Sequence, residues 1–188
     1  QAWLSVMSHP DGEIAFFNDA AIGIAPSPAE LEAYSSRLGL PAGEKAAEPI
    51  QHLKASGYVR LNVGGASAWL DLARIGPDYL PGHAHADTLS FELAINGRRA
   101  LVNSGTSVYG DGVERQRQRG TAAHNTVAIN GRDSSEVWAG FRVARRARPV
   151  AGIVTDGEML SATGSHDGYR WLPGSPRHSR RWDMASGR

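Results

Sequence analysis

Three stretches of this chain alternate apolar and polar residues, and this pattern limits the possible folds more than any other feature. They cover residues 57–63, 68–73 and 89–95. A period of two places alternate side chains on opposite faces, as in a half-buried β-strand. The third stretch ends at Asn96-Gly97, a dipeptide typical of tight antiparallel hairpins, and residues 98–103 are predicted to form the returning strand.

Later segments extend the same architecture. Residues 125–129 are predicted to be a strand that ends at a second Asn-Gly turn. Further strands are expected within residues 141–154, 158–164 and 180–184. Residues 104–122 combine several glycines with many charges and are predicted to be a long loop. The predicted fold class is mainly β, an antiparallel β-sandwich with a short α-helical N-terminal segment.

The N-terminal part has a different pattern. Ser27 suits the N-cap of a helix, and Pro28 suits its first position. Residues 41–49 are rich in Pro, Ala, Gly and Glu and are predicted to be a linker. We therefore expect a helical lead-in with its linker over residues 1–50 and a β domain over residues 51–188.

Composition narrows the range of partners. The chain has 188 residues, 41% of them hydrophobic and 21% charged, as in an ordinary globular domain. A formal net charge of +1 argues against nucleic acid or a membrane surface as a partner. The absence of cysteine excludes disulfides and thiolate metal ligands. No apolar run approaches the roughly twenty residues that span a bilayer.

The histidines at positions 83, 85 and 124 are candidate metal ligands. On a strand, His83 and His85 lie on the same side, and His124 is a distant third imidazole. Two or three imidazoles with an oxygen ligand can bind zinc or a similar ion. Surface or buried structural histidines are the alternative. The candidate oxygen ligands are Asp87, Glu92 and Asn103.

Several motifs in a fixed order carry a family resemblance. Residues 81–91, 102–106 and 121–127 resemble the C-terminal domain of heparinase II/III-like polysaccharide lyases, and residues 134–138 and 141–147 continue the likeness. The resemblance covers about residues 57–182. Residues 1–45 resemble the end of the helical (α/α) toroid that precedes this domain in such proteins.

The resemblance implies a supersandwich-like β domain, truncated here, that packs against a toroid with the substrate cleft between them. It implies β-elimination of a uronic-acid-containing polysaccharide, such as a glycosaminoglycan or alginate. The family usually draws its acid and base groups from the toroid, so the chain by itself is expected to be inactive. The alternative is a non-catalytic carbohydrate-binding or structural β-sandwich.

The resemblance also implies roles for single residues. His83 matches the family histidine that reaches the cleft, and we predict that it is catalytic. His85 and His124 match two ligands of a structural zinc, and Asn103 stands where the family has an aspartate ligand. Asn103 could instead hydrogen-bond His85 or His124 and hold the same geometry without metal.

Substrate-binding candidates lie in the predicted loop. Tyr109 is a possible cleft residue, and Arg115 and Arg119 offer guanidinium groups that match carboxylate or sulfate. A solvated basic loop is the alternative for the arginines. The expected partners are an acidic polysaccharide and a toroid domain. Unpaired strand edges would also allow a homodimer. The resemblance favours a periplasmic or secreted location.

Overall fold

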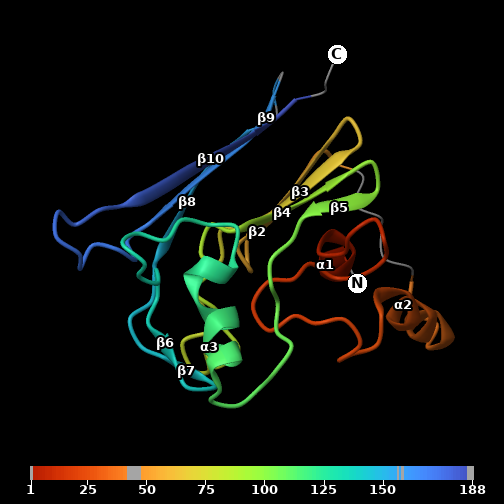
Figure 1. The fold of residues 1–188 in the computed structure, drawn as a ribbon. Helices are drawn as coiled ribbons and strands as arrows, with labels where there is room; N and C mark the ends of the chain where they lie inside the picture. Colours follow the sequence, from red (N-terminus) through yellow and green to blue (C-terminus); the bar gives the residue numbers. More distant parts are fainter. Residues whose placement is uncertain (1, 42–47, 156, 158, 186–188) are drawn as a thin grey trace.

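Two antiparallel sheets dominate the computed structural model, which describes residues 2–41, 48–155, 157 and 159–185 (Figure 1). The larger sheet has the order β1-β2-β3-β4-β5, with bounds Ile50–Leu53, Tyr58–Val63, Ala66–Asp71, Phe91–Ile95 and Arg98–Leu101. The smaller sheet has the order β10-β9-β8, with bounds His178–Met184, Leu160–His166 and Pro149–Thr155. A short hairpin pairs β6 (Val137–Trp138) with β7 (Arg142–Val143).

The two sheets share a hydrophobic core. Leu61 and Leu70 of the larger sheet are completely buried, and they belong to one cluster with Ala162 and Trp182 of the smaller sheet. Leu89, just before β4, completes the same cluster. Burial of such side chains is the main source of stability in a domain of this kind. The predicted mainly β, antiparallel fold is confirmed.

The N-terminal segment covers the other face of the larger sheet. It begins with α1 (Ala2–Val6), which lies beside β5 and away from the smaller sheet in Figure 1. Met7 and Phe17 pack against Trp69 and Ala94 in a second core cluster. The indole Nε1 of Trp69 donates a 2.7 Å hydrogen bond to the Val6 carbonyl. The central strands are therefore buried on both faces.

Glu92 of β4 ties this segment to the sheet. Its carboxylate accepts hydrogen bonds from the main-chain N–H groups of Phe16, at 3.1 Å, and Asn103, at 2.8 Å. The Nε2 atom of His9 lies 2.6 Å from Glu92 Oε2, and the His9 ring stacks on Trp69 with centroids 3.8 Å apart. All these contacts are fully or largely buried, so each would be costly to leave unpaired.

We expect the substitution Glu92→Ala to lower the free energy of unfolding by roughly 3–5 kcal/mol. It leaves an imidazole and two main-chain N–H groups without their acceptor inside the protein. Urea denaturation measures the effect. The control is Glu136→Ala, which removes an exposed carboxylate and should change stability by about 0.5 kcal/mol or less. Equal stability of the two variants would contradict the assigned role.

Two short-range signals are confirmed. The predicted helix is α2 (Pro28–Arg37), and Ser27 and Glu30 form a reciprocal capping box at its start. The predicted hairpin joins β4 and β5, with Asn96 and Gly97 at φ 49° and 77°, as a tight hairpin turn requires. The predicted linker lies mostly outside the described residues. No described helix has the length and apolar character needed to cross a membrane.

Two other expectations were wrong. Residues 125–129 form no strand; a single bridge joins Ile129 to Arg132 across the second Asn-Gly turn. The Asn125 side chain donates to the carbonyls of Phe91 and Val102 at 2.9 Å, so this segment is held by side-chain contacts instead of a ladder. The predicted loop contains α3 (Val113–Arg119), followed by the short 3-10 helix η1 (Thr121–Ala123).

Candidate functional site

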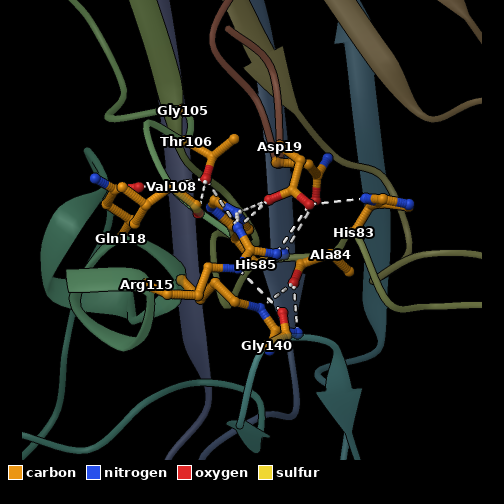
Figure 2. A network of polar contacts seen from close by, with 12 residues as sticks. Asp19, His83, Ala84, His85, Gly105, Thr106, Val108, Arg115, Gln118 and Gly140 are labelled. Carbon is orange, nitrogen blue, oxygen red and sulfur yellow. Dashed lines mark hydrogen bonds and ion pairs between the residues drawn. The ribbon is translucent and has the colours of Figure 1, made fainter. Parts of the chain in front are cut away.

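A buried carboxylate, Asp19, is the centre of the polar network in Figure 2. Its Oδ1 lies 2.7 Å from His85 Nε2, and its Oδ2 lies 2.8 Å from His83 Nδ1. The guanidinium of Arg115 donates to both oxygens, with 2.9 Å between Nη2 and Oδ2. One side chain of the N-terminal segment thus joins three side chains of the β domain.

Asn18 fixes the backbone that carries Asp19. It adopts a left-handed conformation, φ 55°, which asparagine tolerates better than most residues. Its side-chain oxygen accepts a hydrogen bond from the His85 main chain at 3.2 Å, and its own main-chain N–H donates to Asp87 at 3.3 Å. The side-chain amide also donates to the Tyr58 hydroxyl at 3.1 Å. The turn is therefore pinned on both sides.

The network keeps Asp19 ionised. Burial alone would raise the pKa of the carboxyl group, but hydrogen bonds from His85, Arg115 and His83 outweigh that effect. The resulting pKa lies well below the ordinary value of 3.8. An ionised carboxylate can only accept hydrogen bonds, so the neutral forms of both imidazoles must direct an N–H toward it.

His83 faces outward. Its side chain is 65% exposed, whereas Nδ1 is held by Asp19. With Nδ1–H donated to Asp19, the neutral ring carries its free lone pair on Nε2, and no described residue bonds that atom. His83 contacts the edges of two aromatic rings, Phe141 at 5.7 Å and Tyr109 at 6.3 Å between centroids. It also lines a surface hollow of about 620 Å³.

His85 faces inward toward His124, and the two ring centroids are 5.3 Å apart. Both imidazoles are buried. The Nδ1 atom of His85 and both ring nitrogens of His124 have no hydrogen bond of good geometry within the described residues. Burial lowers the pKa of His124, and His85 adds to this, while Asp87 and the nearby Gln118 main chain oppose it. A neutral imidazole with an unused lone pair is the form that binds metal.

Asn103 lies close to this pair but uses its carboxamide elsewhere. Its oxygen accepts a hydrogen bond from the Asn125 main chain at 3.1 Å, and its nitrogen donates weakly to Ser90 at 3.4 Å. It therefore does not hydrogen-bond His85 or His124, which was the metal-free alternative. Within the described ranges, no group of three His, Asp or Glu side chains is arranged to hold a metal ion.

Residues 45–188 match the sequence model of the family described as heparinase II/III-like, C-terminal. This chain belongs to that family. The match covers the whole β domain and begins just before β1. The family resemblance of the histidine motifs is thereby confirmed. Comparison with curated protein sequences gave no significant match.

Solved structures show the same fold for the heparinase II/III-like domain. A crystal structure of heparinase III has a TM-score of 0.73 at 18% identity and matches 97% of this chain. The heparan sulfate lyase HepC from Pedobacter heparinus gives 0.69 at 18% identity and matches 95%. The chain covers 31% and 28% of those two chains, so it spans about three tenths of their length.

Two predicted substrate-binding residues of this heparinase II/III-like domain are internal. Arg115 and Arg119 have no exposed surface. Besides Asp19, Arg115 contacts the Gly140 carbonyl at 3.0 Å and Thr106 at 2.9 Å. Arg119 donates to several main-chain carbonyls, those of Ala84, Trp138, Ala139 and Arg142. In this conformation both guanidinium groups hold the loops around the site together, and their substrate contact stays a prediction.

Tyr109 differs from the arginines. Its ring is 52% exposed and stacks on Phe141, with centroids 5.6 Å apart. Arg115 lies beneath both rings, at 5.2 Å and 5.5 Å from their centroids. The predicted substrate contact of Tyr109 stays a prediction, and the structure places the residue beside His83.

Asp19 was missed by sequence reasoning. It lies 64 positions before His83, in a segment of mixed pattern where it suggested only a turn. The available signal was the adjacent Asn18, a residue suited to a left-handed turn, next to an acidic side chain. Nothing in the spacing indicated which distant residues that carboxylate would meet.

We expect Asp19→Asn to lower the free energy of unfolding by about 3 kcal/mol, because it leaves the Arg115 cation buried without a counter-charge. Urea denaturation at neutral pH measures this. Asp78→Asn is the control, since Asp78 also pairs with an arginine, at 2.9 Å, but is 87% exposed and should contribute no more than about 1 kcal/mol. Equal losses in the two variants would contradict the central role of Asp19.

Proposed function

We propose that this domain forms the β-sandwich side of the active site of a polysaccharide lyase that cleaves an acidic, uronic-acid-containing polysaccharide by β-elimination. One observation carries the proposal: His83 is exposed at the edge of a hollow, and a buried carboxylate holds its inner nitrogen. The names of the structural neighbours, heparinase III and heparan sulfate lyase, support this class of substrate.

The reaction has three chemical needs. The substrate carboxylate must be neutralised so that the C5 proton becomes acidic. A base must remove that proton, and an acid must protonate the C4 oxygen as the C4–O bond breaks and the C4–C5 double bond forms. In this chain, His83 is the candidate base that removes the C5 proton. The other groups are assigned to the toroid that precedes such domains.

Asp19 makes His83 suited to accept the proton. The carboxylate holds Nδ1–H, so the lone pair of Nε2 points toward substrate, and its negative charge stabilises the imidazolium formed by proton transfer. The edge contacts with Phe141 and Tyr109 restrict the ring further. Asp19 is thus a positioning residue, and His83 is the catalytic residue of this domain.

We expect His83→Ala to lower kcat/KM by about 10²–10⁴-fold in the full-length protein, the range typical of a lost general base. Cleavage is followed by the ultraviolet absorbance of the unsaturated uronate product, with heparan sulfate and alginate as substrates. Because His83 also donates to the buried Asp19 carboxylate, we expect a stability loss of about 1–2 kcal/mol beside the loss of rate, and urea denaturation separates the two effects.

Tyr79→Ala is the matched control for this test. Tyr79 is an 88% exposed aromatic on the same β3–β4 connection and lines neither surface hollow. Its substitution should leave the rate unchanged. If the unaltered full-length protein releases no unsaturated product from any uronan, the lyase proposal fails and a non-catalytic carbohydrate-binding or structural role is favoured.

We also propose a structural zinc ion held by His85 Nδ1, His124 and the side-chain oxygen of Asn103. The support is the pair of buried imidazoles with unused nitrogen lone pairs, together with an amide oxygen that accepts one other hydrogen bond. Such an ion would join the two segments that carry the histidines. Asparagine is a weaker ligand than the family aspartate, which predicts lower affinity.

Metal analysis tests this second proposal. Protein purified without chelators should contain about one equivalent of zinc, and His124→Ala should contain less than about 0.2 equivalents. The control is His52→Ala, which removes a histidine on β1 that has no part in the pair and should leave the metal in place. Less than about 0.2 equivalents in the unaltered protein would overturn the zinc assignment.

A further inference from the structure

Two surface hollows of the domain meet. The first, of about 620 Å³, contains His83, and the second, of about 850 Å³, lies between the β3–β4 connection and the loops that flank β8 and β9. Arg74 and Pro149 line both hollows, so the two are adjacent. We call the two hollows together the basic groove. Its cationic residues are Lys54, Arg74, Arg145, Arg146, Arg148 and Arg170.

The basic groove has a strong excess of positive charge. Only two carboxylates, Asp78 and Asp167, occur in the lining against the six cations. Asp78 pairs with Arg146, and Asp167 accepts a 2.7 Å hydrogen bond from the main chain of Arg148. The chain as a whole has a net charge of only +1, so this excess is local.

Five of the six cations form no ion pair with a described residue. Four of these five are exposed: Lys54, Arg74, Arg148 and Arg170. Like charges placed together around a concavity raise the local potential and favour an anionic ligand. Arginine in particular matches the paired oxygens of carboxylate and sulfate groups.

Arg145 gives the basic groove a fixed wall. Arg145 donates to the carbonyls of Ser134, at 3.2 Å, and Gly168, at 2.6 Å. Its guanidinium also lies 4.8 Å from the ring centroid of Trp171, which is 49% exposed. An exposed, oriented indole beside unpaired cations offers an apolar face next to charge, and a charged sugar ring presents the same combination.

We propose that the basic groove binds an extended stretch of an anionic polysaccharide, which runs from the sugar that His83 contacts into the second hollow. Anionic groups of the chain contact Arg74, Arg148 and Arg170, and a sugar ring lies on Trp171. The inference rests on the proposed function for its orientation, since His83 defines the reacting end. The groove then makes the enzyme sensitive to substrate length.

The test uses the full-length protein with Arg148 and Arg170, which line only the second hollow, both changed to Gln. With long heparan sulfate chains, we expect KM to rise about tenfold and kcat to stay unchanged, because distant charge contacts hold substrate and transition state equally. Tetrasaccharides should be cleaved as by the unaltered protein. The salt dependence of binding to long chains should also become less steep.

A matched variant controls for lost charge. Arg132 and Arg177 are exposed arginines outside the basic groove, and changing both to Gln removes the same charge. This variant should keep the KM of the unaltered protein. If both double variants weaken long-chain binding equally, general charge attraction explains it and the groove proposal is overturned.

Binding measurements separate this proposal from the lyase proposal. If no uronan is cleaved, retention of the unaltered protein on immobilised heparan sulfate, lost in the groove variant but not in its control, still supports the groove. Unchanged KM and retention in the groove variant overturn it while leaving the lyase proposal intact. A change in domain contacts or oligomeric state without any change in polysaccharide affinity overturns it as well and identifies a protein-contact surface.

Discussion

The candidate site depends on the hydrogen bonds that stabilise the ionised, buried carboxylate of Asp19. The carboxylate accepts hydrogen bonds from His83, His85 and Arg115, and all three donors belong to the β domain. A buried charge is tolerated only when it is paired and fully hydrogen-bonded, so carboxylate and donors require one another. The candidate site therefore exists only when the N-terminal segment is docked on the sheet.

Docking is provided by contacts far from the histidines. The His9 ring lies between Trp69 and the Glu92 carboxylate, and Glu92 also holds Asn103. Asn103 in turn positions the residue that follows His124. The same glutamate thus stabilises the segment that carries Asp19 and the loop that carries the inner histidine. Met7, Ala15 and Phe17 pack against the larger sheet in this structure, and the expected division of the chain near residue 50 stays a prediction.

The sequence predicted the parts of the fold that depend on local pattern. Alternation located β2, β3 and β4, and Asn96-Gly97 located the turn after β4, because period and turn chemistry act over a few residues. Residues 125–129 show the limit of that approach. They were predicted to form a strand, but the Asn125 side chain donates to two neighbouring main chains and takes the place of a strand ladder. A sequence pattern indicates the propensity of a segment to form a strand, whereas tertiary contacts decide whether that strand pairs.

For the same reason, the sequence identified the histidines of the site but not their orientation. His83 and His85 were expected on one side of a strand. They lie instead in the irregular connection before β4, and both reach the same carboxylate from opposite oxygens. The separation into an exposed and a buried imidazole comes from a third residue that no spacing in the motif could reveal.

Arg115 and Arg119 are buried residues of a helix within a segment that was predicted to be a loop. α3 follows a glycine-rich run, and its arginines looked like a solvated or ligand-binding set. A helix turns its residues through about 100° per position, so Arg115 and Arg119, four apart, point the same way, into the protein. Arg115 balances the charge of Asp19 through hydrogen bonds to both carboxylate oxygens. That balance leaves His83 able to present a lone pair to solvent, and the exposed arginines of the basic groove, which have no such partner, remain available for an anionic ligand.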